Sequence, residues 1–139
     1  MQRIMIVSDT HRRHGNLAEA IYNEGHLDML IHLGDVEGEE EVIKSIAGCE
    51  TIFIAGNNDF FSPLDREKEI ELGGKKIWLT HGHNYYVSLD LKVIEQEAVA
   101  RINKCYIILH DNNRPVCIPT YIILEINDNN EFNFELKNV

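Results

Sequence analysis

Acidic, amide and imidazole side chains gather directly after five short apolar segments of this chain. The segments read RIMIV, LIHL, TIFIA, KIWLT and YIIL. The polar residues that follow them are, in chain order, Asp9, His11, Asp35, Asn57, His81, His83, His110 and Asp111. Oxygen and imidazole donors without cysteine suit divalent ions such as Mn²⁺, Fe²⁺, Ni²⁺ or Zn²⁺. These residue types and their placement therefore predict a metal site.

The elements that must position these residues can be predicted from the hydrophobic pattern. Short apolar runs alternate with amphipathic stretches, which indicates parallel β-α units, and later hairpins indicate antiparallel additions. We expect strands at 1–7, 29–33, 51–55, 67–72, 75–80, 105–109, 121–126 and 132–136, and helices at 16–24, 39–47 and 88–103. The carboxyl ends of parallel strands meet at one crevice, whose loops are free to carry polar groups. The fold class expected is therefore a mixed, layered α/β domain spanning residues 1–139, with the polar side chains converging on one cleft.

The amino-acid composition restricts the classes of molecule that this protein is expected to bind. The formal net charge is −10, from 13 Lys and Arg against 23 Asp and Glu. Such a surface repels phosphate backbones, so no extended nucleic-acid groove is expected, whereas bound metal ions would attract a small phosphorylated substrate. No apolar run approaches the roughly 20 residues of a membrane span. The sequence leaves open whether the chain forms a homo-oligomer.

The cysteines and the N-terminus bear on the compartment. Cys49, Cys105 and Cys117 match no zinc-binding spacing, so we interpret them as reduced thiols. The first residues enter a strand pattern directly and show no signal peptide. Both observations predict a cytoplasmic protein.

Each motif by itself also fits an ordinary loop. D-x-H recurs in surface loops, and G-D and G-N-x-D are common turn sequences because Asp and Asn tolerate left-handed backbone. His32 lies inside an apolar strand and is expected to be a structural core histidine. The order of the motifs and their shared position at strand ends favour a functional site.

The series SDTH, HLGD, GNND and THGH resembles the calcineurin-like metallophosphoesterases, most closely their small prokaryotic phosphodiesterase branch of the YfcE type. The resemblance runs from the first strand to about residue 110 and resumes in the final hairpin. It implies a four-layer α-β-β-α sandwich with mixed sheets, here slightly truncated at the C-terminal end. It also implies two divalent metal ions at the strand ends.

The resemblance assigns a role to each matched residue. Asp9 and His11 would hold the first ion, Asp35 would bridge both, and Asn57 and His81 would hold the second. The implied reaction is phosphodiester hydrolysis by a metal-activated water, with ions roughly 3.5–4 Å apart. Mn²⁺ is the favoured ion, and Ni²⁺, Fe²⁺, Zn²⁺ and Mg²⁺ are the alternatives.

The chain departs from the family pattern at two places. Where the family has G-H-x-H, with one histidine for each metal, this chain reads HDNN. We expect Asp111, or His110 after a one-residue shift, to supply a ligand there. Asn58 stands where relatives carry His or Cys, and an amide cannot act as a general acid. Protonation of the leaving group then falls to His83, to water or to no group.

Two other functional classes stay open at this point. A degenerate phosphoesterase-fold module that binds a partner has a precedent in the retromer subunit of this fold, and it predicts weak metal binding and an exposed apolar patch. A metallohydrolase acting on another bond is the third alternative. Bound metal in the purified protein would distinguish a phosphoesterase from the degenerate binding module. Hydrolysis of a chromogenic phosphodiester would distinguish a phosphoesterase from a metallohydrolase that acts on another bond.

Overall fold

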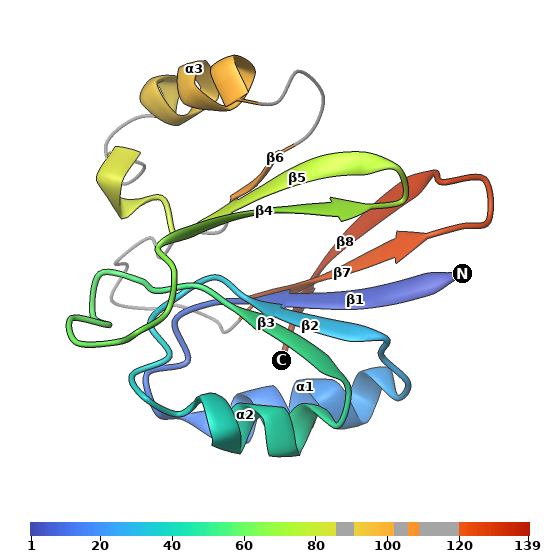
Figure 1. Ribbon diagram of the computed structural model, residues 1–139. Coiled ribbons are helices and arrows are strands. Elements are labelled where there is room, and N and C mark those ends of the chain that lie inside the picture. The colour runs from blue at the N-terminus through green and yellow to red at the C-terminus, as the bar shows by residue number, and fades with distance from the viewer. Residues whose placement is uncertain (86–90, 102–105, 109–119) are drawn as a thin grey trace.

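Two β-sheets lie face to face at the centre of the protein in a computed structural model, with helices on both outer sides (Figure 1). The structure describes residues 1–85, 91–101, 106–108 and 120–139. The larger sheet has the strand order β3-β2-β1-β7-β8. These strands are β1 (Gln2–Val7), β2 (Met29–His32), β3 (Glu50–Phe53), β7 (Thr120–Ile126) and β8 (Phe132–Asn138).

The smaller sheet has the order β4-β5-β6. Its strands are β4 (Glu67–Leu72), β5 (Lys75–Thr80) and β6 (Tyr106–Ile108). The helices are α1 (His14–Glu24), α2 (Glu40–Ala47), α3 (Lys92–Arg101) and the short 3-10 helix η1 (His83–Tyr85). None of these helices has the length and hydropathy of a membrane-spanning segment.

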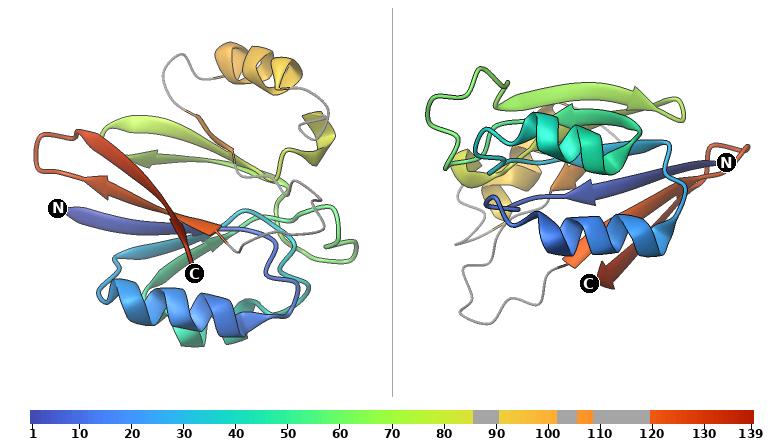
Figure 2. Two further views of the ribbon diagram at one scale, coloured as in Figure 1. Left: turned by 180° about the vertical axis from the view of Figure 1, so that it is seen from behind. Right: turned by 90° about the horizontal axis from the view of Figure 1, so that it is seen from below.

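Strand pairing follows the expected mixture of parallel and antiparallel units. β1 pairs parallel with β2, and β2 with β3, whereas β7 pairs antiparallel with β1 and β8 with β7. In the smaller sheet, β4 and β5 form an antiparallel hairpin, and β6 pairs parallel with β5. Helices α1 and α2 cover the outer face of the larger sheet, and α3 lies beyond the smaller one (Figure 2). The predicted four-layer sandwich is confirmed.

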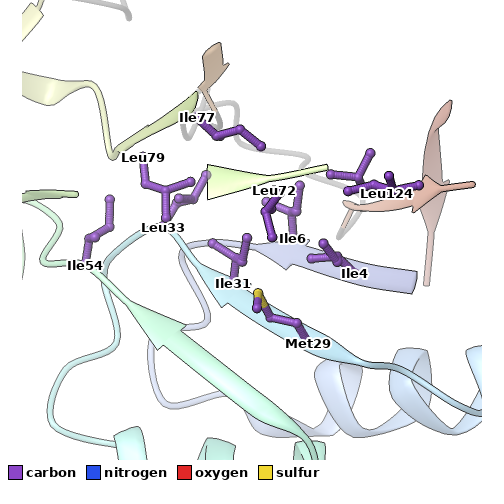
Figure 3. Packing of buried hydrophobic residues seen from close by; sticks show 11 residues of the cluster. Ile4, Ile6, Met29, Ile31, Leu33, Ile54, Leu72, Ile77, Leu79 and Leu124 are labelled. Carbon is purple, nitrogen blue, oxygen red and sulfur yellow. The ribbon is translucent and has the colours of Figure 1, made fainter. Parts of the chain in front are cut away.

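The apolar strands are buried on both faces, which explains why they read as continuous hydrophobic runs. Along β1, Ile4 and Ile6 point between the sheets, and Met5 and Val7 point toward the helices. Figure 3 shows the cluster between the sheets. Its buried members are Ile4, Ile6, Met29, Ile31, Leu33, Ile54, Leu72, Ile77, Leu79, Leu124 and Ile126. On the opposite face of β5, Trp78 packs against α3.

A charged network fixes the end of α1 to the larger sheet. The Glu24 carboxylate, only 5% exposed, accepts hydrogen bonds from the Arg3 guanidinium at 2.8 Å, the Tyr121 hydroxyl at 2.7 Å and the Lys137 ammonium at 2.9 Å. Burial favours the neutral acid, but these three donors outweigh it and lower the pKa of Glu24. Burial and the bond to Glu24 raise the pKa of Tyr121 to about 12.

Several element boundaries differ from the prediction. The third strand ends at Phe53 rather than at residue 55, because the Ala55 amide donates to Asp65 at 2.8 Å and the chain turns away from β2. The first helix begins two residues earlier, at His14. The third helix is described over Lys92–Arg101, and positions 88–90 and 102–103 of that prediction lie outside the described residues.

Candidate metal centre

The loops that follow β1, β2, β3 and β5 meet at one end of the two sheets, at the left of Figure 1. Backbone hydrogen bonds fasten the first two loops to each other. The Asp9 amide donates to the Gly34 carbonyl at 2.9 Å, and the His11 amide donates to the Asp35 carbonyl at 3.4 Å. The residues of the D-x-H and G-D motifs are therefore held side by side by the backbone itself.

Three side chains form the centre of this cluster. Asp9, Asp35 and His81 each offer one possible ligand atom, and these atoms lie within 4.8 Å of one another. The His81 Nε2 atom is 3.8 Å from a carboxylate oxygen of Asp9 and 3.8 Å from one of Asp35. The His11 Nε2 atom lies 3.6 Å from each of the same two oxygens. Two imidazoles thus lie close to the same pair of carboxylate oxygens.

The contacts of His81 indicate that its Nε2 atom has a lone pair available for a metal ion. Its Nδ1 atom lies 2.8 Å from the Leu33 carbonyl, which can only accept, so Nδ1 carries the proton. Nε2 then presents a lone pair, and it faces the Asn57 Oδ1 atom at 2.9 Å. Two ligands about 2.1 Å from an ion and roughly at right angles lie about 3.0 Å apart. These two electron-pair donors therefore fit a shared divalent cation.

Asp35 is an ionised carboxylate in a nearly closed environment. Only 2% of its side chain is exposed, and it accepts hydrogen bonds from the Asn58 amide at 2.8 Å and from Asn58 Nδ2 at 3.0 Å. Burial raises its pKa, but the contact with Asp9 and the hydrogen bonds from Asn58 outweigh burial, and the pKa is lowered. Asn58, which offers no acid group, thus holds the central carboxylate in place.

Asp59 fastens the loop after β3 to the loop after β2. Its carboxylate accepts four backbone N–H groups: Asp35 at 2.7 Å, Val36 at 3.2 Å, Glu37 at 2.6 Å and Gly56 at 2.7 Å. A buried carboxylate that accepts four charge-assisted hydrogen bonds has a structural role. It sets the positions of Asp35 and of the Asn57–Asn58 turn together.

Glu37 lies behind His11, on the side away from the central carboxylates. One of its carboxylate oxygens is 3.5 Å from His11 Nδ1, while His11 Nε2 faces Asp9 and Asp35. The Glu37 backbone is held by Asp59 and by the Arg12 guanidinium, which donates to the Glu37 carbonyl at 3.3 Å. Carboxylates in this position orient metal-binding histidines and increase their basicity.

The backbone of these loops is unusually constrained. Among the residues that the structure describes, six non-glycine residues have positive φ, and five of them lie in the first two loops of the site. A Cβ atom on Gly34 would approach His81 Nδ1 to 2.7 Å, and one on Gly56 would collide with Asp35. Strained backbone of this kind concentrates at functional sites.

Two further histidines lie close to the cluster. The His83 ring centroid is 5.4 Å from that of His81, and its buried Nδ1 atom has no hydrogen-bond partner among the described residues. Burial, together with His81 and Arg66, lowers the pKa of His83. His32 is fully buried, as expected of a core residue: Nδ1 accepts from the Gly34 amide and Nε2 contacts the Thr10 hydroxyl at 2.9 Å. Burial lowers the pKa of His32 to about 3.

The structure brings together the residues Asp9, His11, Asp35, Asn57 and His81. Their roles as ligands stay predictions, as does the catalytic role of His83. Residues 110 and 111, predicted to replace the lost histidine ligands, lie outside the described residues.

Sequence reasoning assigned no role to Asp59 or Glu37. A signal for Asp59 was available, because an Asp that closes a G-N-x-D turn at a strand end is well placed to accept backbone N–H groups. Glu37 offered no comparable signal, since its contact with His11 depends on how two loops meet.

Residues 2–110 match the family model described as the calcineurin-like phosphoesterase superfamily domain. The probable metallophosphoesterase MJ0623 of Methanocaldococcus jannaschii is 33% identical over 87 residues, which are 60% of this chain and 44% of that protein. The chain spans about half the length of the curated relatives it matches.

Solved structures share the fold at low sequence identity. A conserved protein of Streptococcus pneumoniae, described as a predicted phosphoesterase, superposes with a TM-score of 0.72 at 20% identity, covering 99% of this chain and 89% of that one. Vps29 of Entamoeba histolytica, solved with Zn²⁺, has a TM-score of 0.72 at 16% identity and covers 99% of both chains. Yfce, a phosphoesterase from E. coli, has a TM-score of 0.61 at 17% identity, again over 99% of both.

Proposed function

The chain belongs to the calcineurin-like phosphoesterase superfamily, and from this premise we propose that it hydrolyses a phosphodiester in a small substrate with the help of two divalent ions. The observation that carries the proposal is the grouping of Asp9, Asp35 and His81, whose possible ligand atoms lie within 4.8 Å of one another. His11 lies next to the two carboxylates of this group, and Asn57 lies next to its histidine.

The contacts of Asp35 support a count of two ions. Its Oδ2 atom lies between His11 Nε2 at 3.6 Å and His81 Nε2 at 3.8 Å. Asp9 Oδ1 lies at the same two distances from these imidazoles, and the family pattern pairs Asp9 with His11 and Asn57 with His81 as the two donor sets. A carboxylate between two such sets is suited to bridge the ions that they hold. The share of oxygen donors favours Mn²⁺ as the ion.

Divalent ions bound here would neutralise phosphate charge and supply a water molecule of lowered pKa. The chain's own residues prepare the site for that chemistry. The Leu33 carbonyl fixes the proton of His81 on Nδ1, and Asn58 keeps Asp35 ionised and oriented. Asp59 holds the two loops in register, so the donor atoms need little rearrangement on binding.

The leaving group receives little help from acid groups in the described part of the site. Asn58 offers an amide, and the lowered pKa of His83 leaves its imidazole largely neutral near pH 7. We therefore propose a substrate whose leaving alcohol is acidic enough to depart without a strong general acid.

The altered HDNN segment is proposed to contribute one more ligand, from Asp111 or His110. The strand before it, β6, pairs parallel with β5, so it ends at the same edge of the sheet as His81. Asp111→Ala and His110→Ala, separately and together, should lower metal stoichiometry. Full metal content in all three variants would show that this segment supplies no metal ligand.

The proposed activity is tested with bis(p-nitrophenyl) phosphate and the metal-free protein reloaded with Mn²⁺, Ni²⁺, Zn²⁺ or Mg²⁺. Substitution of groups that only support metal ligands costs about 10–100-fold, so loss of the bridging ligand in Asp35→Ala should cost more than about 100-fold. The Asp35→Asn variant should also have low activity, because the amide carries no charge. Near-normal turnover in either variant would contradict the bridging role. Stable metal binding without hydrolysis of any phosphoester would favour a binding module.

A further inference from the structure

Two adjacent phenylalanines lie in the loop that carries part of the candidate metal centre. Phe60 is 74% exposed and Phe61 is fully exposed. They directly follow the G-N-N-D turn in the loop between β3 and β4, which extends past the strand ends in Figure 1. Exposing two aromatic side chains at consecutive positions to water is unfavourable, and exposed apolar surface of this kind marks a binding surface more often than a lone exposed side chain does.

The segment that presents these rings is fixed by hydrogen bonds. Asp59, the residue before them, accepts four backbone N–H groups from two loops. The Ser62 amide donates to the Asp59 carbonyl at 3.3 Å, and the Ala55 amide closes the loop on Asp65 at 2.8 Å. A surface ordered in advance binds a ligand without the entropic cost of ordering a loop.

The rings are close to the proposed reaction centre along the chain. Asn58 donates two hydrogen bonds to Asp35, and Phe60 is only two residues further on. Consecutive Cα atoms are about 3.8 Å apart, so the Cα atoms of Asn58 and Phe60 lie within roughly 7 Å. A substituent of a phosphoester bound at Asp35 is therefore within reach of these side chains.

The chemistry of the pair specifies its occupant. Phenyl rings donate no conventional hydrogen bond and carry no charge, so they select a flat, uncharged group by stacking and by burial of apolar surface. Other exposed large hydrophobic residues among those described lie on different elements, such as Tyr22 on α1 and Leu136 on β8. The Phe60–Phe61 pair differs from them in that it lies in a loop that also carries Asn57 and Asn58 of the candidate metal centre.

We propose that Phe60 and Phe61 form a subsite for a flat aromatic substituent of the phosphoester substrate, such as an aryl group or a nucleobase. The inference rests on the proposed function, because it places the phosphoryl group at the neighbouring metal centre. It narrows the substrate class from phosphodiesters in general to those that carry an aromatic substituent.

Phenylphosphonate and methylphosphonate provide a matched pair of probes. Both present the same anionic head, and only one carries a ring. Their affinities for the Mn²⁺-loaded protein are measured by calorimetry for the wild type, for the double variant Phe60→Ala/Phe61→Ala and for Tyr22→Ala as a control exposed aromatic. Wild type and Tyr22→Ala should bind phenylphosphonate about tenfold more tightly than methylphosphonate. The double variant should lose that preference and keep its affinity for methylphosphonate.

Equal affinities in the wild type, an undiminished preference in the double variant, or no binding of either phosphonate would overturn the inference. Hydrolysis of bis(p-nitrophenyl) phosphate is assayed in the same wild-type preparation. Hydrolysis without a phenyl preference refutes the subsite alone, whereas a phenyl preference without hydrolysis refutes the proposed activity and leaves the subsite supported.

Discussion

Replacement of Asp59 by alanine should destabilise the protein although this residue is assigned no contact with substrate or metal. Asp59 is buried, with 7% of the residue exposed. Its carboxylate accepts hydrogen bonds from the backbone N–H groups of Asp35, Val36, Glu37 and Gly56. Alanine removes all four acceptor contacts. Each buried donor left without a partner costs about 1–3 kcal/mol.

The four contacts do not contribute equally. Three are 2.7 Å or shorter, and the Val36 amide at 3.2 Å is weaker. Water entering the space left by the carboxylate would satisfy part of the loss. We therefore expect Asp59→Ala to lower the free energy of unfolding by about 3–5 kcal/mol. Asp59→Asn keeps one oxygen but loses the charge, and it should cost about 2 kcal/mol.

Urea denaturation of the metal-free protein measures both losses without a contribution from bound ions. Asp128→Asn is a matched control, because the Asp128 side chain is 94% exposed and contacts only the N-terminal amine in the described structure. That variant should change the free energy of unfolding by less than about 0.5 kcal/mol. If Asp59→Ala were as stable as the control, the carboxylate would not be holding the two loops.

Three further predictions concern Glu37, Glu24 and the leaving group. Glu37→Gln should weaken Mn²⁺ affinity about 10–100-fold, measured by calorimetry, because the charge behind His11 is lost; unchanged affinity would show that Glu37 does not orient this histidine. The lowered pKa of Glu24 predicts a stability contribution that is complete above its unfolded value near 4.5 and is lost as pH falls through the lower folded value. Urea midpoints between pH 7 and pH 3 should therefore fall less steeply in Glu24→Gln, which should cost about 1–2 kcal/mol at pH 7; parallel curves would refute the linkage. Because His83 has a lowered pKa and Asn58 offers no acid, the rates of aryl phosphodiesters should rise steeply as the leaving phenol becomes more acidic, and a flat dependence would reveal a general acid.

Much of the fold could be predicted because its signals are local. The apolar runs of β1 and β2 are buried on both faces, and β4 and β5 form an antiparallel hairpin at the predicted residues 67–72 and 75–80. The end of β3 could not be predicted in the same way. It depends on the Ala55 amide turning to Asp65, a contact between loop residues that hydrophobic periodicity does not reveal.

The candidate site shows the same division. Asp9, Asp35 and His81 were predictable because each follows an apolar strand, and parallel strands deliver such residues to one edge. The contacts that hold these residues in place could not be predicted, because they join residues that are distant in sequence. His81 bonds to a carbonyl 48 residues away, and Asp59 reaches the Glu37 amide 22 residues away. Such contacts follow from how the loops pack together, and residue type alone does not specify them.

The central claim is that these strand ends bind metal ions. It is tested most directly by titrating Mn²⁺ into metal-free protein and measuring bound metal per chain, for the wild type and for Asp35→Asn. The predicted result is two ions per wild-type chain and a loss of at least one in the variant, with the fold retained by circular dichroism. A wild-type chain that binds no divalent ion, or an Asp35→Asn variant that binds as many as the wild type, would contradict it.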